Sequence, residues 1–499
     1  MFEAAELGRK ISKAEFKQAE QELRTELLAV QRALRTADFP VVVIVSGVEG
    51  AGKSEVVNRF SKWLDMRGVV TTSFFDETEE ERERPRYWRF WRTLPANGQI
   101  GVFYGSWYTQ PIIQRVLGEM DEAAYERELS RIASFERMLA LEGALFVKLW
   151  FHLSENAVAR MFDKHSKKEK KALRSEWRTN PYSKRFAKRY REFAEVSERA
   201  IRMTDLGVSP WHIVEAEDRR YRELRAGQLL LQRLRERLKR AAQSSDPQTP
   251  EEPIPEPGED LTVLSRVDLE QSLEESSYRK QLKQEQARLR ELTLRAREAK
   301  RSTVILFEGW DAAGKGGAIR RVCAAMDARL YRVIPIAAPT DEERAHHYLW
   351  RFWRHLPRAG FVTIFDRTWY GRVLVERVEG FASSEQWKRA FLEINRFEEE
   401  LAEHGTVVCK FWLHLSPEEQ LRRFEERQAT PWKQHKITEE DWRNRERWGA
   451  YERAVNDMVV RTSTSYAPWT LVAGDDKLFA RVQVVRAVCD QLEAALKQD

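Results

Sequence analysis

Cysteines are scarce in this sequence, and long apolar runs are absent. Only three cysteines, Cys323, Cys409 and Cys489, occur among the 499 residues, which excludes a disulfide framework, and none is spaced as a zinc ligand. There is no run of about 18 or more apolar residues, which excludes a transmembrane helix. The first ten residues contain acidic side chains and no apolar run behind a basic cluster, so we expect no secretory signal. These absences predict a cytoplasmic protein with no membrane partner.

A large excess of one charge is absent as well. The chain carries 85 basic and 79 acidic residues, which gives a net charge of +6. Such a mild excess indicates an anionic partner only where the basic residues are clustered. Apolar residues make up 42% of the chain, which is enough for sizeable cores. Length and composition together indicate a globular protein of roughly three domains or two large ones.

The sequence is built from two related halves separated by a proline-rich segment. Residues 241–260 contain five of the 17 prolines and no basic residue, which is typical of an extended linker. The glycine-rich sequences that begin at Gly47 and Gly309 are 262 positions apart, and the same spacing relates WRFWRTLP to WRFWRHLP. Towards the end of each half the spacing becomes 258, as between Trp211 and Trp469. We therefore predict a first domain of residues 1–240, a linker of residues 241–260 and a second domain of residues 261–499.

Each half alternates apolar runs with helical patterns. Residues 41–46 and 303–308 are continuous apolar runs, as buried parallel strands require. Further strands are expected at 100–104, 144–151 and 211–214, and at 361–365, 406–413 and 469–472. Because helical segments lie between the strands, the pattern predicts an α/β fold in which helices cover both faces of a parallel sheet. Charged amphipathic helices are expected at 11–36 and 265–300, for packing or dimerisation.

A glycine-rich loop follows the first buried strand of each half. Both loops have the pattern G-x-x-x-x-G-K, in which backbone N–H groups and a lysine surround phosphate oxygens at a helix N-terminus. The first loop ends in GKS, whereas the second ends in GKG and lacks the hydroxyl that normally contacts magnesium. Asp311 inside the second loop could hold the metal instead, and the first loop has the longer Glu49 there. The candidate phosphate-binding residues are Gly47, Gly52, Lys53 and Ser54 in the first half, and Gly309, Ala313, Gly314, Lys315, Gly316 and Gly317 in the second.

The two halves differ most where the strands at 100–104 and 361–365 end. The second half continues with Asp366 and Arg367 and then, five residues later, Arg372. An acidic side chain at the carboxyl end of a parallel strand lies where open α/β sheets bind ligands, and the arginines could neutralise a transferring phosphoryl group. The first half has tyrosine, glycine and glutamine at these three positions. We therefore expect the first half to hold phosphate but to transfer it poorly or not at all.

Three motifs of the second half resemble those of the polyphosphate kinase 2 family. The members of this family are P-loop kinases related in fold to thymidylate kinase. The motifs are GWDAAGKGG (309–317), FDRTWYGR (365–372) and APW (467–469). The resemblance covers nearly all of 265–495 and, in weaker form, nearly all of 10–235. A tandem of one complete and one degenerate copy is similar to the family members that phosphorylate AMP. The resemblance implies two P-loop kinase domains, each with a helical lid, and transfer of the terminal phosphoryl group of inorganic polyphosphate to AMP, giving ADP.

The resemblance also implies roles for individual residues of the second half. The implied catalytic residues are Asp311, Lys315, Asp366, Arg367 and Arg372, and the implied metal ligands are Asp311 and Asp366, for Mg²⁺ or alternatively Mn²⁺. Arg351 and Arg354 are candidates for the wall of a polyphosphate channel, but they recur as Arg89 and Arg92, so a structural role is equally compatible. The candidate lid cations are Lys433, Lys436 and Arg443. Trp350, Trp353 and Trp369 are expected to be core residues.

A basic stretch of the first half has two interpretations. From Lys164 to Glu192 there are twelve basic and three acidic residues, whereas Gln420 to Arg447 has eight and six. The stretch is either a solvated helical face or a surface that collects polyphosphate for the second half.

Three other functions are compatible with the residues. The acceptor could be a nucleoside diphosphate, so that ADP or GDP becomes a triphosphate. The donor could be ATP, although the missing Ser or Thr after Lys315 and the many arginines favour a long polyanion. A nucleic-acid-binding P-loop protein without transferase activity fits the basic stretch but not the Asp366–Arg367 site. The resemblance implies polyphosphate and AMP or ADP as partners. We expect no specific nucleic acid, and the sequence leaves homo-oligomerisation open.

Overall fold

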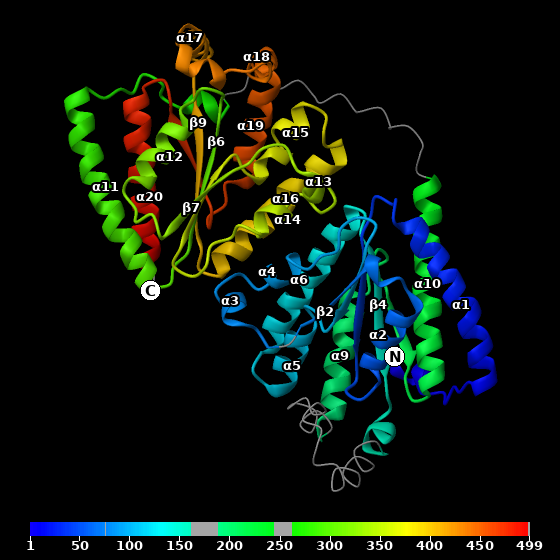
Figure 1. The fold of residues 1–499 in the computed structure, drawn as a ribbon. Coiled ribbons are helices and arrows are strands. Elements are labelled where there is room, and N and C mark those ends of the chain that lie inside the picture. Colours follow the sequence, from blue (N-terminus) through cyan, green and yellow to red (C-terminus); the bar gives the residue numbers. More distant parts are fainter. Residues whose placement is uncertain (75, 161–187, 244–261, 498–499) are drawn as a thin grey trace. The chain divides into compact units, whose positions relative to one another are not determined.

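The structure is a computed structural model that describes residues 1–74, 76–160, 188–243 and 262–497 (Figure 1). The chain forms two compact units, which we call the first and the second domain. The first comprises Met1–Glu77, Arg89–Gln248 and Asp341–His347, and the second comprises Thr78–Trp88, Thr249–Thr340 and Tyr348–Asp499. Most of the predicted linker and most of the basic stretch, including Lys164 and all residues up to 187, lie outside the described residues.

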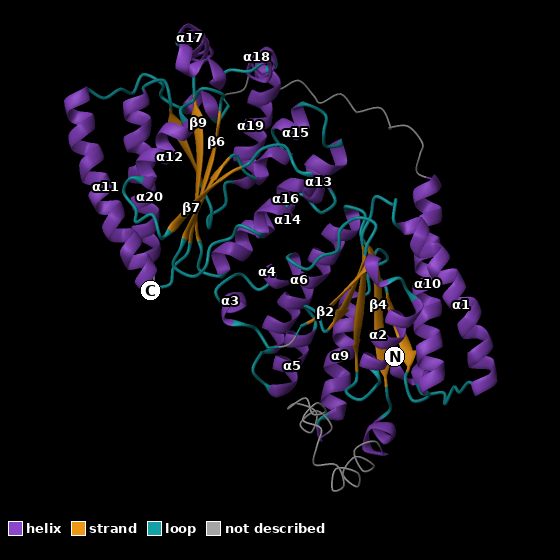
Figure 2. Ribbon diagram, viewed as in Figure 1, coloured by secondary structure: helices purple, strands orange, loops and turns teal. Residues whose placement is uncertain are grey.

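The first domain contains a parallel sheet of five strands in the order β2-β3-β1-β4-β5 (Figure 2). The strands are β1 Val41–Gly47, β2 Val69–Ser73, β3 Ile100–Tyr104, β4 Leu145–His152 and β5 Trp211–Glu215. β1 and β4 lie in the middle and are buried, because helices cover both faces of the sheet. β2 lies at the edge and exposes Val70 and Thr71, so it lacks the continuous apolar run that identifies the central strands.

The helices of the first half cover both faces of this sheet, except for the helix Glu79–Arg82, which belongs to the compact unit of the second domain. They are α1 Lys13–Leu34, α2 Lys53–Trp63, α3 Glu79–Arg82, α4 Trp88–Trp91, α5 Thr109–Leu117, α6 Glu122–Leu141, α9 Tyr190–Thr204 and α10 Arg219–Gln243, with 3-10 helices at Phe2–Ala5 and Met66–Gly68. α1 packs along α10 and next to α2, whereas α5, α6 and α9 pack together elsewhere on the sheet. The predicted amphipathic helix at 11–36 is therefore a packing helix of the first domain.

The second domain repeats this architecture with the strand order β10-β9-β6-β8-β7. The strands are β6 Thr303–Gly309, β7 Tyr331–Pro335, β8 Val362–Asp366, β9 Val407–His414 and β10 Trp469–Ala473. The helices of the second half are α11 Glu275–Glu298, α12 Lys315–Cys323, α13 Asp341–Arg344, α14 Trp350–Trp353, α15 Val375–Val378, α16 Ser384–Glu403, α17 Pro417–Ala429, α18 Glu439–Glu446, α19 Trp448–Thr462 and α20 Lys477–Leu496, with 3-10 helices at Leu264–Arg266, Trp369–Arg372 (η4) and Pro431–Lys436. Of these, α13 belongs to the compact unit of the first domain. Two parallel sheets covered by helices confirm the predicted α/β fold class.

One predicted helix of the second half begins later than expected. The charged pattern predicts a helix over 265–300, but α11 begins at Glu275. The segment before α11 contacts α19 instead of continuing the helix. The Leu264 side chain is buried, and the Leu264 backbone N–H donates to Asn456 Oδ1 at 3.4 Å. α11 itself packs along α20.

A buried ion pair recurs at the same place in both domains. In the second domain Lys410 Nζ lies 2.7 Å from Glu398 Oε2, and both side chains are completely buried. Glu398 Oε1 also accepts hydrogen bonds from Tyr370 Oη at 2.6 Å and Trp369 Nε1 at 3.0 Å. Lys410 additionally donates to the Thr462 carbonyl at 2.7 Å, which ties β9, α16, η4 and α19 together.

The first domain contains the same arrangement, built from Lys148 and Glu136 at 2.7 Å. Tyr108, Trp107 and the Thr204 carbonyl supply the corresponding hydrogen bonds. Because the pair persists in the copy that lacks the second motif, its role is architectural. Trp350, Trp353 and Trp369, which we expected to be core residues, are all buried.

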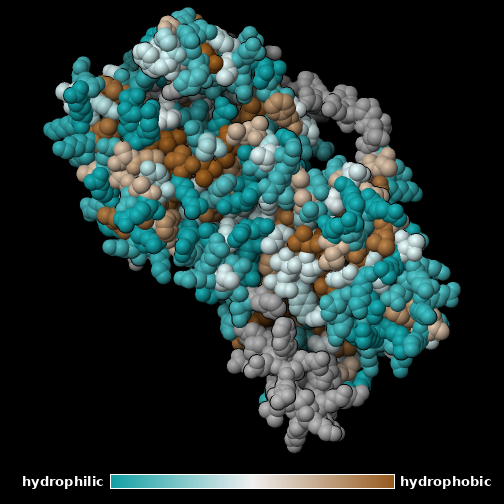
Figure 3. Space-filling model, viewed as in Figure 1, coloured by the Kyte–Doolittle hydropathy of each residue, from teal (hydrophilic) through white to brown (hydrophobic). Residues whose placement is uncertain are grey.

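The visible surfaces of the two domains are mostly hydrophilic, with scattered small apolar areas (Figure 3). Within the described residues, every helix is too short or too polar to pass through a lipid bilayer.

We expect Lys410→Met to destabilise the second domain by about 3–5 kcal/mol, because Glu398 is left buried without its cation. Urea unfolding of the full chain measures the effect. Arg396→Met on the exposed side of α16 is the control and should change stability by less than about 0.5 kcal/mol. Equal effects of the two substitutions would contradict the proposed importance of the buried pair.

Candidate functional site

The phosphate loop of the second domain joins β6 to α12. Gly309 ends β6 with φ +150°, and a Cβ there would lie 2.6 Å from the Leu413 carbonyl oxygen of β9, so a side chain cannot be accommodated. Gly314 caps α12 with φ +101°. Ala312 between them has φ +66°, an uncommon conformation for a residue with a side chain. The loop therefore turns tightly and directs its backbone towards the N-terminus of α12.

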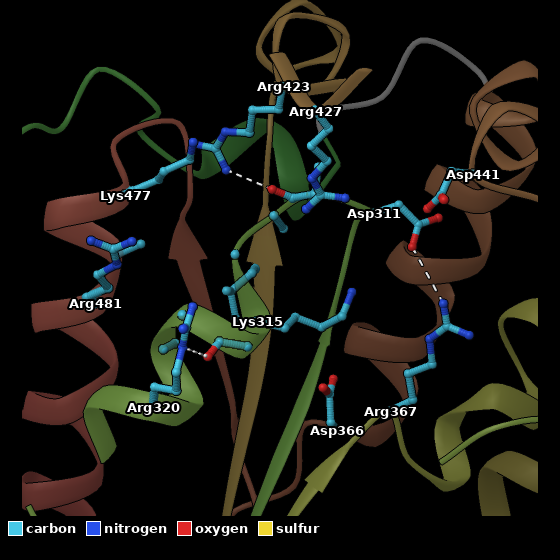
Figure 4. A pocket seen from close by; sticks show the side chains of 18 of the residues that line it. Asp311, Lys315, Arg320, Asp366, Arg367, Arg423, Arg427, Asp441, Lys477 and Arg481 are labelled. Atoms are coloured by element: carbon cyan, nitrogen blue, oxygen red, sulfur yellow. Dashed lines mark hydrogen bonds and ion pairs between the residues drawn. The ribbon is translucent and has the colours of Figure 1, made fainter. Parts of the chain in front are cut away.

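A pocket of about 650 Å³ lies above this loop (Figure 4). It is lined by the basic residues Lys315, Arg320, Arg367, Arg423, Arg427, Lys477 and Arg481, by the acidic residues Asp311, Asp366, Glu426 and Asp441, and by residues 312–318 of the loop and the first turn of α12. Seven basic residues against four acidic ones give the pocket an excess of positive charge, which suits a ligand with many phosphate groups.

Four of the predicted catalytic residues meet in this pocket. Asp311 and Lys315 come from the loop, and Asp366 and Arg367 come from the end of β8, which is paired with β6. Arg367 Nη2 lies 3.7 Å from Asp311 Oδ1. Arg367 also has φ +64°, and such left-handed non-glycine residues are concentrated at functional sites.

The lysine of the loop is bonded to the loop itself. Lys315 Nζ donates to the carbonyl oxygens of Gly309 at 2.7 Å and Trp310 at 3.2 Å. The ammonium is therefore held at the centre of the loop, next to the place where the loop N–H groups and the α12 N-terminus attract an anion.

Asp311 is oriented by a residue that the sequence analysis did not single out. Asn444 of α18 donates from Nδ2 to Asp311 Oδ2 at 3.0 Å, and the Asn444 side-chain oxygen accepts from Tyr451 Oη at 3.1 Å. The Asp311 side chain is only 17% exposed. The lid helix α18 is thus bonded to the phosphate loop through the side chain of the proposed metal ligand.

Arg423 of α17 supports the loop from outside and was also missed. Its guanidinium is buried, donates from Nη1 to the Ala312 carbonyl at 3.0 Å and from Nη2 to the Gly474 carbonyl at 2.6 Å, and pairs with Glu419. These bonds hold the strained Ala312 in place. In the sequence Arg423 is one of several basic residues in a charged segment, and nothing distinguishes it there from its neighbours.

Glu308 is a third functional candidate that was missed. Its carboxylate is buried directly before the loop and accepts hydrogen bonds from Thr368 N at 2.7 Å and Thr368 Oγ1 at 2.8 Å. Burial raises its pKa to about 6, although Thr368, Lys315 and Arg367 act in the opposite direction. The bonds fix the turn that carries Asp366 and Arg367. A signal existed in the sequence, because the first half has Ser46 at the position of this glutamate.

Arg372, the fifth predicted catalytic residue, lies outside the pocket lining. Its Nη1 lies 2.9 Å from Glu376 Oε2, and its guanidinium stacks over the Tyr348 ring at 4.4 Å. The 3-10 turn η4 causes this, since Trp369 and Tyr370 are bonded to the buried Glu398 and the chain turns away from the pocket after Arg367.

Other predicted binding residues also lie outside the lining. Arg351 donates to the Ala337 carbonyl at 3.0 Å, Arg354 stacks over Trp350 at 4.5 Å, and Arg443 lies 3.3 Å from Glu379. The side chains of Lys433 and Lys436 are outside the described part of the structure. A role for these residues in substrate binding stays a prediction.

The loop of the first domain has a different set of contacts. Lys53 donates to the Gly47 and Val48 carbonyls at 2.9 Å, as Lys315 does in its own loop, but it also lies 3.7 Å from Glu49 Oε2. Ser54 Oγ donates to Tyr104 Oη at 3.2 Å, where the second domain has Asp366. The loop geometry is thus retained without the second acidic residue.

The chemistry of Asp311 and Asp366 fits a hard divalent cation. Both offer carboxylate oxygens to one pocket, which are the ligands that Mg²⁺ and Mn²⁺ prefer. No group of three or more Asp, Glu, His or Cys side chains suited to a metal occurs in the described residues. The pair therefore fits an ion that takes its remaining ligands from phosphates and water.

Comparisons with known proteins agree over both domains. The family model described as polyphosphate kinase 2 (PPK2) matches residues 10–242 and 272–499. A polyphosphate:AMP phosphotransferase of Pseudomonas aeruginosa is 47% identical, and one of Pseudomonas syringae is 45% identical; the alignments cover 100% of this chain and 100% and 99% of those proteins. A crystal structure of polyphosphate kinase 2 from Pseudomonas aeruginosa, 46% identical, superposes with a TM-score of 0.88 and full coverage of both chains.

The raised pKa of Glu308 makes a pH-dependent prediction. The folded protein binds the Glu308 proton more tightly than the unfolded chain, so the contribution of this group to stability falls as pH rises from about 4.5 through about 6. Glu308→Gln removes the titratable carboxylate and therefore this pH-dependent contribution to stability. We expect the variant to gain up to about 2 kcal/mol relative to wild type between pH 4.5 and pH 7. Urea unfolding at both pH values measures the gain; Glu440→Gln on exposed α18 is the control, and parallel pH profiles for wild type and Glu308→Gln would contradict the prediction.

Proposed function

Because the chain belongs to the polyphosphate kinase 2 family, we propose that it transfers the terminal phosphoryl group of inorganic polyphosphate to AMP, giving ADP and a polyphosphate shorter by one unit. Full-length similarity to two polyphosphate:AMP phosphotransferases supports this acceptor. One structural observation supports the assignment most directly: Asp311, Lys315, Asp366 and Arg367 line a single basic pocket on the phosphate loop of the second domain. We therefore assign catalysis to the second domain.

The reaction breaks the bond between the terminal phosphorus and its bridging oxygen and forms a bond to a phosphate oxygen of AMP. That acceptor oxygen is already ionised near neutral pH, so no general base is required. The enzyme must align two polyanions and offset their charge. The loop N–H groups and the α12 N-terminus bind phosphate oxygens, and Lys315 donates to them with the N–H group that its two carbonyl bonds leave over.

Arg367 acts on the charge that spreads over the transferring group. Its guanidinium is half exposed in the pocket and lies beside Asp311, so it can reach a phosphoryl group that enters between the loop and β8. Bidentate contacts from a guanidinium suit the planar arrangement of oxygens in phosphoryl transfer. Glu308 holds the turn that carries Arg367, through Thr368.

Asp311 and Asp366 would bind Mg²⁺, or alternatively Mn²⁺. When bound, the ion neutralises phosphate charge and orients the two substrates. Asn444 keeps the Asp311 carboxylate directed into the pocket. Because Asn444 lies on the lid helix α18, lid position and carboxylate orientation are coupled.

The side of the pocket formed by α12 and α20 suits the polyphosphate chain. Arg320, Lys477 and Arg481 lie there, on the opposite side from Asp311 in Figure 4. A chain with about one charge per phosphate would be attracted over a long range, and this attraction would weaken with salt.

We expect Asp366→Asn to reduce ADP formation from AMP and long-chain polyphosphate by about 1,000-fold, because it removes one of two carboxylates from the site. Tyr104→Phe at the equivalent position of the first domain is the matched control and should keep most of the activity. The measurement is the initial rate of ADP production with Mg²⁺. Wild type that phosphorylates ADP but not AMP would show that the proposed acceptor is wrong, and wild type that phosphorylates neither would contradict the proposed function.

We expect Arg481→Ala to raise the KM for long-chain polyphosphate about tenfold, the effect of one lost charge-assisted contact, with little change in the KM for AMP. Steady-state kinetics at two salt concentrations separate these effects. Arg486→Ala lies on the same helix, outside the pocket lining, and serves as the charge-matched control. A rise confined to the KM for AMP would reverse the assignment of the two sides of the pocket.

A further inference from the structure

The two phosphate loops differ in what lies over their second glycine. Gly52 and Gly314 both cap the helix that follows the loop, with φ +76° and +101°. A Cβ on Gly314 would meet nothing within 4 Å, and this space is part of the pocket. A Cβ on Gly52 would lie 2.1 Å from Arg222 Cζ and from Arg222 Nη2. The space that is open in the second domain is therefore filled by a guanidinium in the first.

Arg222 stands where the second domain has an alanine. It lies in the first turn of α10, and Ala480 lies in the first turn of α20, 258 positions later, which is the spacing that also relates β5 to β10. The same backbone bond marks both positions: Arg222 N donates to Asp218 O at 3.0 Å, and Ala480 N donates to Asp476 O at 3.1 Å. Ala480 is one of the residues that line the pocket.

A second difference explains why the arginine enters the loop. In the second domain Arg423 approaches from α17 and donates to the Gly474 carbonyl, which leaves the pocket open. The first half has Met161 at the position of Arg423, and the carbonyl equivalent to that of Gly474 belongs to Ala216. Arg222 Nη1 donates to this carbonyl at 3.0 Å. The equivalent carbonyl thus receives a guanidinium in both domains, but in the first the guanidinium passes over the glycine of the loop.

The remaining cation and the hydroxyl of the first loop are also bonded within the chain. Glu49 lies beside the Lys53 ammonium, and Ser54 donates to Tyr104. The Arg222 side chain is buried against the loop, and its residue is 9% exposed. A phosphate placed over Gly52 would have to displace this guanidinium from a buried position.

We propose that the residue pair Arg222 and Ala480 decides which phosphate loop is open, so that the first domain is closed to phosphate by its own arginine and each chain has one phosphate-binding loop. The proposal rests on the function proposed above only in so far as the second loop binds the polyphosphate substrate. It makes Ala480 a specificity-determining residue, because its small side chain leaves room for phosphate groups at the α20 side of the pocket.

The opposite role for Arg222 would be to recruit an anion, and this role predicts a different experimental result. Within the described structure, Arg222 Nε is buried and has no hydrogen-bond partner. A guanidinium that recruits an anion would use this donor, and its removal would then weaken binding. Removal of a guanidinium that occupies the anion position would instead create a binding site.

The experiment is calorimetric titration of tripolyphosphate into the full chain with Mg²⁺. We expect one site in wild type, two in Arg222→Ala, none in Ala480→Arg, and one in the double variant, where it now lies in the first domain. Arg225→Ala, an exposed arginine of the same helix, is the control and should keep one site. ADP formation should fall about 100-fold or more in Ala480→Arg, as on loss of groups that stabilise phosphoryl charge, and should persist in Arg222→Ala.

Each departure from these values has a distinct meaning. Two sites in wild type would overturn the proposal. Loss of a site in Arg222→Ala would also overturn it and would assign anion recruitment to Arg222. Ala480→Arg that binds tripolyphosphate and retains full activity would also overturn it. No site in wild type but one in Arg222→Ala would support the closure of the first loop while contradicting the proposed function of the second. Thermal unfolding of each variant establishes that the change lies in binding and not in folding.

Discussion

The pair of completely buried charges under each sheet is the interaction on which the rest of the molecule depends. A lysine of β9 and a glutamate of α16 are both removed from water, so each is tolerable only while the other is in place. The same glutamate also receives hydrogen bonds from Trp369 and Tyr370 in η4. Since η4 directly follows Asp366 and Arg367, the ion pair sets where those two side chains can lie.

The same network in the first domain shows that scaffold and chemistry can change independently. Lys148, Glu136 and the bonded aromatic residues form the same network as in the second domain, whereas Tyr104 stands at the end of the strand where the second domain has Asp366. Loss of a carboxylate at the sheet edge leaves the buried network intact, because no bond of that network involves this position. A domain can therefore lack this carboxylate and still fold around the same core.

The sequence was sufficient to predict the central strands, because they are buried on both faces and read as continuous apolar runs. The edge strands β2 and β7 escaped detection since their residues are partly exposed. The common position of Asp311, Lys315, Asp366 and Arg367 in one pocket could be predicted because each lies in a short contiguous motif. Arg423 and Asn444 could not, because their importance arises from contacts between helices and a loop more than 100 residues away. Arg372 has the right spacing in the sequence, but η4 directs it towards Glu376.

The carbonyl bonds of Lys315 have a consequence for how the loop binds phosphate. The ammonium has three N–H groups and donates two of them to the Gly309 and Trp310 carbonyls, so one remains for a phosphate oxygen. The loop therefore holds the cation in place before a phosphate arrives, so binding requires little further ordering of the lysine side chain.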